Sequence, residues 1–160
     1  MKIRSAIISD IIKVSRLWMQ MVTELAPELT PNAYWWRVQA ESALKQDNYF
    51  MYVAEEGGKI IGFIDYFLFA EPATGMRHCV GQHFFVLPEY RGGSTSASLW
   101  KTVMRVSKAQ GSQIWELFCF EKEKEFWGKK GFSQKRCLVR KELRGAMNGR
   151  TRAMSDTVCV

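Results

Sequence analysis

Hydrophobic and polar residues near the start of the chain follow two successive patterns. Polar and apolar side chains alternate over Lys2–Ile8, which predicts a first strand. Apolar residues then recur at helical spacing and predict a helix, for which Ser9 or Asp10 can serve as the N-cap. The expected inward face of this helix consists of Ile11, Val14, Trp18, Met21, Val22 and Leu25.

A second helix is predicted from Asn32 to about Gln46, with Thr30 as its cap and Pro31 in its first turn. It carries several large apolar residues, namely Tyr34, Trp35, Trp36, Val38 and Leu44. Packing in the core is one interpretation of these aromatic residues. The other is that they form a wall of a substrate pocket.

The middle of the chain predicts a hairpin, a strand and a helix in succession. Two apolar, aromatic-rich runs flank Glu56–Lys59, whose two glycines supply the positive φ of a tight turn. A further strand is predicted over His78–Leu87. The helix after it runs over Ser94–Gln110, and Gly111 ends it in the C-cap role.

The last part of the chain predicts a strand over Gln113–Phe120, a short charged helix over Glu121–Lys130 and a strand over Gly131–Leu143. Strands in the middle are expected to pair as an antiparallel meander, and strands separated by helices favour a crossover. Residues 1–143 are therefore expected to form a single domain. Residues 144–160 show no clear period and are expected to be a flexible or loosely docked tail.

Composition narrows the class of protein. The chain has 160 residues, of which 47% are hydrophobic and 24% charged, as in ordinary soluble globular domains. It lacks both a long apolar stretch that could span a membrane and a secretory signal pattern, so a cytoplasmic location without membrane association is expected. The four cysteines and two histidines do not have metal-site spacing, so no metal is expected.

The formal charge of +7 is unevenly distributed. Residues 1–120 hold 12 Lys or Arg against 11 Asp or Glu, whereas residues 121–160 hold 11 against 5. A basic C-terminal quarter could bind a nucleic acid or an acidic protein. A solvated surface with a loose tail is the favoured interpretation, because the charges are not interleaved with a nucleic-acid motif.

The turn between the strand His78–Leu87 and the helix Ser94–Gln110 carries the clearest chemistry. Six consecutive residues, Gly92–Ala97, have no side chain larger than threonine. The first N–H groups of a helix favour anions, and small residues let a phosphate approach them. Arg91 adds a guanidinium fork suited to phosphate oxygens. The turn matches neither a Walker loop nor a Rossmann fingerprint.

This stretch, FFVLPEYRGG, resembles the GNAT superfamily of N-acetyltransferases, in which an apolar-Val-x-Pro-x-Tyr-Arg-Gly run leads into R-x-x-G-x-G/A at a helix start. Serines 94 and 96 stand where the family has its later glycines. In the family this turn binds the pyrophosphate of acetyl-coenzyme A (acetyl-CoA) through backbone N–H groups. The resemblance therefore implies cofactor contacts from Phe85, Val86, Arg91, Gly92, Gly93, Ser94, Thr95, Ser96 and Ala97.

A second run, Phe126–Phe132, resembles the F-Y-x-x-x-G-F pattern of the same family. The resemblance implies a mixed α/β fold with a mostly antiparallel sheet of about six strands flanked by about four helices. It also implies cofactor contacts from Phe126 and Trp127. In many family members the tyrosine of this pattern protonates the leaving thiolate, but this chain has Trp127, whose indole N–H is a donor and not a practical acid.

The reaction implied by the resemblance is attack of a neutral amine on the acetyl thioester, so a base or a water chain should take the amine proton. Family members often place an acidic residue on the strand before the turn, where this chain has Gln82 and His83. His83 is the natural candidate, because an unperturbed histidine titrates at about 6.5. A packing or surface histidine is the alternative. Glu116 is a second candidate and Asp65 a third, with an exposed strand carboxylate as the alternative for both.

Two functions follow from these observations. The first is an acetyl-CoA-dependent N-acetyltransferase acting on an amine of a small molecule, peptide or protein. The second is a GNAT-fold binding or structural protein without efficient transfer, which the two serines and Trp127 favour more than usual. The amine is not identified by the sequence, and a homodimer is compatible with it.

Overall fold

The computed structural model describes residues 1–119 and 123–134. The chain divides into two compact units, Met1–Leu117 and Phe118–Val160. The first unit contains β1 (Lys2–Ser5), η1 (Ile8–Asp10), α1 (Ile11–Leu25), α2 (Ala33–Ala43), β2 (Tyr49–Glu56), β3 (Lys59–Ala70), β4 (Arg77–Val86), η2 (Pro88–Tyr90), α3 (Ser94–Ala109) and β5 (Ile114–Leu117). The described part of the second unit contains α4 (Lys124–Lys129).

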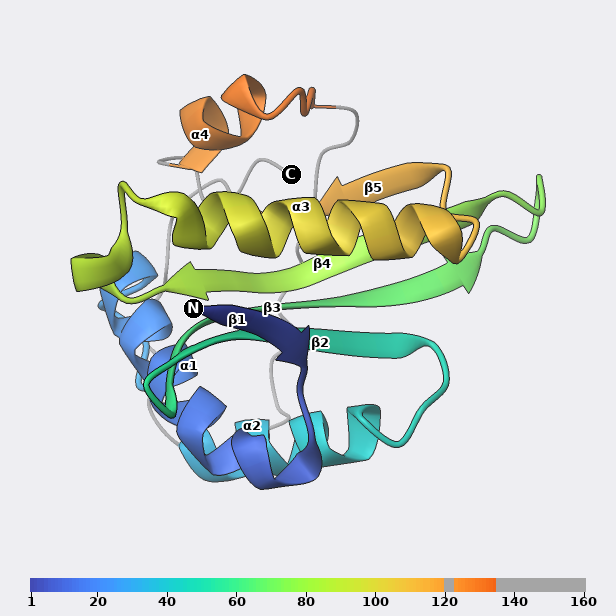
Figure 1. The fold of residues 1–160 in the computed structure, drawn as a ribbon. Coiled ribbons are helices and arrows are strands. Elements are labelled where there is room, and N and C mark those ends of the chain that lie inside the picture. The colour runs from blue at the N-terminus through green and yellow to red at the C-terminus, as the bar shows by residue number, and fades with distance from the viewer. Residues whose placement is uncertain (120–122, 135–160) are drawn as a thin grey trace. The chain divides into compact units, whose positions relative to one another are not determined.

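The five strands of the first unit form one sheet in the order β1-β2-β3-β4-β5. The first four pair antiparallel with their neighbours, and β5 pairs parallel with β4 after the crossover through α3. Helices α1 and α2 cover one face of the sheet and α3 covers the other (Figure 1). The predicted mixed, mostly antiparallel α/β fold is confirmed. A sixth strand was expected over Gly131–Leu143, most of which lies outside the described residues; residues 131–134 form no strand.

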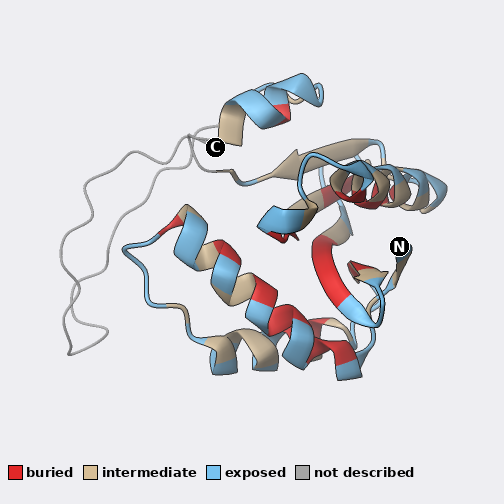
Figure 2. Cartoon of the chain, turned by 60° about the vertical axis from the view of Figure 1, so that its left-hand side comes forward, coloured by how far each residue is buried: buried red, intermediate tan, exposed pale blue. Residues whose placement is uncertain are grey.

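The core lies between the sheet and its helices, as the red segments of Figure 2 show. Helix α1 buries one face against the sheet, through Ile11, Val14, Leu17 and Met21. Helix α3 buries Leu99 and Val103 completely on the other side. The β2–β3 turn has Gly57 and Gly58 at φ values of 55° and 77°, as the two glycines predicted.

The caps of the first two helices agree with the prediction only in part. Asp10 stands at the N-cap position of α1, as predicted, but its carboxylate accepts the Ile7 N–H at 2.9 Å and makes no cap hydrogen bond to the helix. Helix α2 is capped by Asn32, whose side chain accepts the Trp35 N–H at 3.1 Å, and not by Thr30. In α2 a residue of the capping type thus stands two positions after the predicted one, and the local chain path selects between them.

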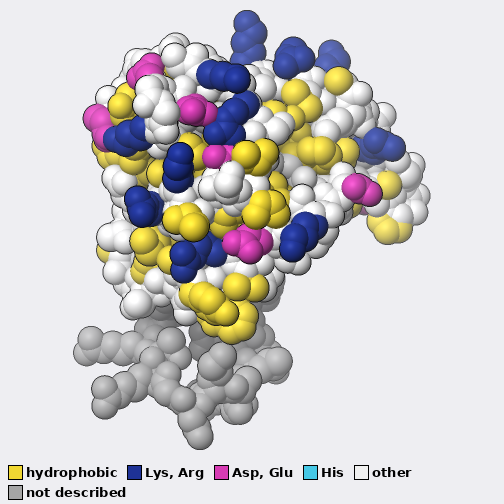
Figure 3. All heavy atoms as spheres, turned by 60° about the horizontal axis from the view of Figure 1, so that its bottom comes forward, with side chains coloured by type: hydrophobic (Ala, Val, Ile, Leu, Met, Phe, Trp, Pro, Cys, Tyr) yellow, Lys and Arg dark blue, Asp and Glu magenta, His cyan; other side chains and the backbone are white. Residues whose placement is uncertain are grey.

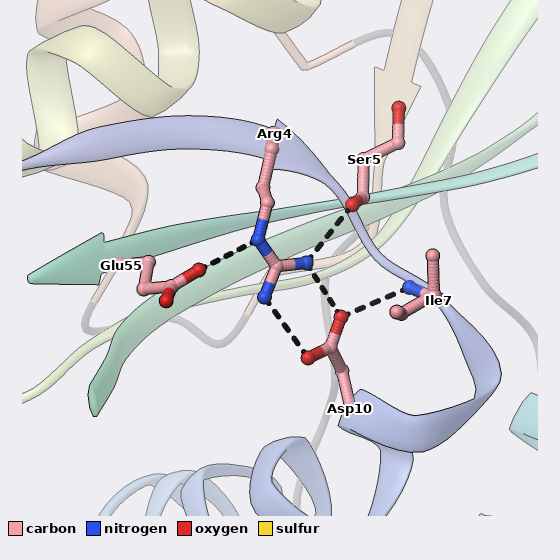
Figure 4. Close-up of polar contacts among 5 residues, drawn as sticks. All are labelled: Arg4, Ser5, Ile7, Asp10 and Glu55. Carbon is pink, nitrogen blue, oxygen red and sulfur yellow. Dashed lines mark hydrogen bonds and ion pairs between the residues drawn. The ribbon is translucent and has the colours of Figure 1, made fainter. Parts of the chain in front are cut away.

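Asp10 is also part of a partly buried ionic cluster at the edge of the sheet (Figure 4). Arg4 of β1 donates to both Asp10 oxygens, at 2.6 and 3.0 Å, and to Glu55 of β2 at 2.6 Å. The hydrogen bonds from Arg4 outweigh burial and hold the pKa of Asp10 below its ordinary value. The cluster therefore joins β1 and β2 to the start of α1.

The outer face of α1 and α2 mixes exposed hydrophobic side chains with lysines and arginines (Figure 3). Its exposed large hydrophobic residues include Ile12, Tyr34, Trp35 and Val38. Within the described ranges, no helix is long and apolar enough to cross a membrane. The same residues contain no group of three or more His, Cys, Asp or Glu side chains that could hold a metal ion.

Candidate functional site

The C-terminal half of β4 is not paired with β5. Strand β5 pairs with β4 over His78–Gly81 and ends there, whereas β4 continues to Val86. The Leu87 N–H donates to Ile61 of β3 at 2.9 Å, so by strand alternation the backbone groups of Val86 face the opposite, unpaired edge. This edge lies directly before the predicted anion-binding turn.

A β-bulge separates the paired and unpaired halves of β4. Asp65 of β3 stands opposite His83 and Tyr66 stands opposite Gly81, so Gln82 is the extra residue. A bulge increases the local twist and re-aims the residues beyond it. Gln82, predicted as a catalytic candidate, thus occupies the bulge, and His83 directly follows it.

His83 and Asp65 form a close pair on the sheet face that α1 and α2 cover. The imidazole Nδ1 lies 3.0 and 3.1 Å from the two Asp65 oxygens, and the His83 backbone N–H donates to Oδ1 at 2.8 Å. The Tyr49 hydroxyl donates to Asp65 Oδ2 at 2.5 Å. On the far side of the ring, the Trp18 indole N–H donates to His83 Nε2 at 3.3 Å. The geometry therefore assigns the Nδ1–H tautomer to the neutral ring.

The charges of this network define its protonation states. Burial lowers the pKa of His83, but the charge of Asp65 and its hydrogen bond raise this pKa by more than burial lowers it. The net shift is upward from 6.5. Burial, the Asp65 charge and the hydrogen bond to Asp65 raise the pKa of Tyr49 far above its ordinary value, so this tyrosine remains a hydrogen-bond donor. The Asp65 side chain is 1% exposed and the His83 side chain 26%. A buried carboxylate thus orients an imidazole that solvent reaches.

Glu116, the second predicted base, lies in a different cluster. Its Oε2 is 3.6 Å from Nδ1 of His78, and Glu71 lies 3.8 Å from Nε2 of the same ring. His78 pairs with the first residue of β5, whereas His83 lies beyond the end of the β4–β5 pairing. Among the predicted catalytic residues, Asp65 therefore contacts His83, whereas Glu116 lies beside His78.

The turn after β4 provides an uncapped helix start. Gly92 has a φ of 76°, which favours glycine, and Gly93 is the N-cap residue of α3 without a side-chain cap. A Cβ atom added at either glycine would meet no atom within 4 Å. Thr95 is buried, whereas Ser94 and Ala97 are exposed. The first N–H groups of α3 therefore have room for an anion next to them.

The Arg91 side chain is held by three internal contacts. Its Nη1 and Nη2 donate to the two carboxylate oxygens of Glu24 in α1, at 2.6 and 2.8 Å. Its Nε donates to the Val86 carbonyl at 2.8 Å, and the guanidinium lies 5.1 Å from the Phe85 ring centroid. The hydrogen bond to Glu24 is the main cause that raises the pKa of Arg91. The fork predicted to bind phosphate thus holds α1, β4 and the turn together in this structure.

The second unit contains the other two predicted cofactor residues. Trp127 is buried, and its ring centroid lies 5.0 Å from that of Phe126 and 5.5 Å from that of Phe132. The Phe132 N–H donates to the Trp127 carbonyl at 3.1 Å. Cofactor contacts from Phe126 and Trp127 stay a prediction.

Three residues of the site were not predicted to belong to it from the sequence: Trp18, Glu24 and Tyr49. Trp18 and Tyr49 reach the His83–Asp65 pair from α1 and β2, and Glu24 reaches Arg91 from α1. The one available signal was Asp65 itself, a single carboxylate inside the apolar run of β3. A charge in such a run requires partners in the fold.

A family model and several solved structures match this chain. The family model described as an acetyltransferase (GNAT) domain matches residues 47–134. A mutant of a Bacillus halodurans protein has 20% identity and a TM-score of 0.76, covering 89% of this chain and 100% of its own. Glucosamine-6-phosphate N-acetyltransferase from Arabidopsis thaliana has 22% identity and a TM-score of 0.70, covering 88% and 97%.

An aminoglycoside N-acetyltransferase in complex with CoA is similar as well, with 18% identity and a TM-score of 0.72, covering 90% of this chain and 95% of its own. At these identities the solved structures show a common fold. A search among curated proteins finds no match.

Proposed function

Because the chain belongs to the GNAT acetyltransferases, we propose that it is an acetyl-CoA-dependent N-acetyltransferase acting on an amine of a small molecule, peptide or protein. The observation that carries the proposal is the His83–Asp65 pair beside the unpaired end of β4. A base oriented by a buried carboxylate, on the strand that leads into an uncapped helix start, suits transfer from an anionic acyl donor to an amine.

The residues of the turn and the strand edge fit the cofactor. The backbone N–H groups at the start of α3 would bind its pyrophosphate, and the open space at Gly92 and Gly93 would admit it. The Val86 N–H, on the edge of β4 that β5 leaves unpaired, would hold the chain that carries the acetyl group, whereas the Val86 carbonyl is bound by Arg91 Nε. Bound acetyl-CoA supplies the acetyl thioester, whose C–S bond breaks as the C–N bond to the acceptor forms and coenzyme A leaves as the thiolate.

His83 is assigned the role of general base. Its Nδ1–H is engaged with Asp65, so Nε2 is the nitrogen that takes the proton from the attacking amine. The imidazolium that results lies beside the Asp65 carboxylate, which stabilises its charge. Asp65 is a positioning residue here, because its oxygens are directed at His83 and Tyr49. No side-chain acid is assigned to the thiolate, since Trp127 occupies the family's tyrosine position.

A binding protein that retains the GNAT fold is the second candidate, and the Arg91–Glu24 pair favours it. The two terminal nitrogens of Arg91 are bound to a carboxylate, so the fork gives less attraction to a phosphate than an unpaired arginine would. The two candidates differ in turnover and agree in binding coenzyme A. A binding measurement alone therefore does not separate them.

The deciding experiment measures thiol release from acetyl-CoA with a panel of amines, for the wild type, His83→Gln and His78→Gln. We expect amine-dependent release by the wild type and a loss of about 100-fold or more in His83→Gln, typical of a missing general base. His78→Gln is the matched control and should retain the ascending limb of the pH profile. Absence of transfer to any amine would support the binding protein, and an unchanged His83→Gln profile would remove His83 from the mechanism.

A further inference from the structure

The His83 imidazole lies in a cluster of aromatic rings that come from three elements. Trp18 of α1 and Trp36 of α2 are stacked, with centroids 5.5 Å apart and planes at 21°. The Trp36 ring lies edge-on to His83 at 6.3 Å. Phe63 of β3 lies 6.2 Å from both His83 and Trp36. The proposed base therefore has aromatic neighbours, with Asp65 on its Nδ1 side.

This cluster combines fully buried and partly exposed side chains. Phe63 is completely buried and Asp65 is 1% exposed, so neither can meet a ligand from solvent. His83, Trp18 and Trp36 each retain partial exposure. The parts of the cluster that solvent reaches therefore belong to the imidazole and the two indoles.

The hydrogen bond from Trp18 marks where an amine would sit. Nε2 is the proton-accepting nitrogen of His83, and the indole N–H already donates to it at 3.3 Å, near the long end of the hydrogen-bond range. An amine that gives its proton to Nε2 must first donate an N–H to the same lone pair. It therefore replaces the indole N–H, and the carbon group attached to the amine lies against the tryptophans.

We propose that the acceptor is a primary amine carried on an aromatic or alkyl body, bound against Trp18 and Trp36. This inference rests on the transferase function proposed above and names its substrate class. Indole faces offer dispersion contacts and attract a cationic amine before it loses its proton. They offer no partners for sugar hydroxyls or phosphates, which lose affinity when they are buried without hydrogen bonds. The carboxylate of the cluster, Asp65, is already bound to His83 and Tyr49.

The first test measures binding without turnover, using 2-phenylethylamine as the probe. The chain has two histidines, so proton NMR can follow both rings after assignment with His83→Gln. We expect a saturable shift of the His83 resonances and none of the His78 resonances. Trp36→Leu should weaken binding by about tenfold, as expected for the loss of an aromatic contact to a cationic amine.

The matched control is Trp35→Leu. Trp35 is the neighbouring residue of α2 and its side chain is 59% exposed, in ring contact with Tyr34. This variant should bind the probe as the wild type does. Trp18→Phe keeps a ring and removes the competing N–H, so it should bind equally or more tightly, and it serves as the second test if Trp36→Leu does not fold.

Kinetic measurements then test the acceptor class separately from the transferase function on which it rests. We expect kcat/KM for 2-phenylethylamine to exceed that for glucosamine 6-phosphate by at least about tenfold. Transfer to glucosamine 6-phosphate in preference would leave the transferase in place and overturn the acceptor class. Saturable binding at His83 without transfer to any amine would support the amine site and reject the transferase. Absence of a His83 shift, or equal effects of Trp36→Leu and Trp35→Leu, would overturn the inference.

Discussion

Gly62→Ala is expected to destabilise the protein at the point where β3, β4 and α3 meet. Gly62 stands opposite Val86 in the β3–β4 pairing. A Cβ atom there would lie 2.9 Å from the Phe85 carbonyl oxygen, 3.0 Å from Val86 Cγ2 and 3.2 Å from Leu99 Cδ1. The first of these is a backbone atom of the sheet, so the added methyl group must displace the strand or the helix above it.

The magnitude follows from two opposing effects. Overpacking of a core costs about 1–3 kcal/mol. Replacing glycine by alanine also restricts the unfolded chain, which stabilises the fold by about 0.4–1 kcal/mol. We therefore expect a net loss of about 1–2 kcal/mol in the free energy of unfolding, which corresponds to a melting temperature lower by about 2–8 °C for a chain of this size.

The assay is urea denaturation of the wild type, Gly62→Ala and the control Gly81→Ala. Gly81 is also a strand glycine, but its Cβ would meet Trp115 Cζ3 at 3.4 Å and Leu117 Cβ at 3.6 Å, which are ordinary contacts. Gly81→Ala should be neutral or stabilising by up to about 1 kcal/mol. Equal midpoints for the two variants would refute the steric reasoning.

The same substitution has a consequence for the cofactor. Displacement of Phe85 and Val86 moves the strand edge that we assign to coenzyme A, so Gly62→Ala should weaken its binding in a calorimetric titration. Gly81→Ala should bind normally, because its added atom makes ordinary contacts. Normal binding by a destabilised Gly62→Ala would place the cofactor away from this edge.

Three further predictions concern the site and the ionic cluster. Asp65→Asn should lower kcat/KM by about ten- to hundredfold, which is the contribution of one charged hydrogen bond. The ascending limb of the pH profile should move to lower pH, because the Asp65 charge raises the pKa of His83 against the effect of burial. An ascending limb that stays at the same pH would contradict this. Ser96→Leu should abolish binding of coenzyme A in calorimetry while Ser96→Gly retains it, since the backbone N–H groups bind the phosphates; normal binding by the leucine variant would place the phosphate site elsewhere. Arg4→Met should cost about 1.5–3 kcal/mol in urea denaturation at pH 7. Because the pKa of Asp10 is lowered in the folded state, this difference should shrink as the pH falls through that value and the carboxylate is protonated. A difference of the same size in acid would refute the assignment.

Several predictions about the C-terminal quarter remain as they were made from the sequence. Two of them, the single domain over residues 1–143 and the tail 144–160, involve residues outside the described ranges. The other two, a homodimer and a nucleic-acid or acidic-protein partner for the basic end, involve contacts with other molecules. Lys129 is described, and it pairs with Glu125 one helical turn earlier at 2.6 Å. That pair supports a solvated helix surface for this lysine.

The sequence by itself determined the order of the described helices and strands, the hairpin at Gly57 and the turn after β4. These features depend on local causes: apolar periodicity, the φ of glycine, and the size of the side chains next to a helix start. The GNAT resemblance was readable for the same reason, because its residues lie close together along the chain. The cap of α2 was missed by two positions, since Thr30 and Asn32 have the same capping chemistry.

Only the tertiary structure decided which groups meet. His83 and Asp65 lie 18 residues apart, Trp18 and His83 lie 65 apart, and Glu24 and Arg91 lie 67 apart. Such pairs depend on strand register, and the bulge at Gln82 sets which side chain of β4 stands opposite Asp65. Period and composition do not encode a register shift of one residue. The same shift changes His83 from a lone strand histidine into an imidazole held by a buried carboxylate.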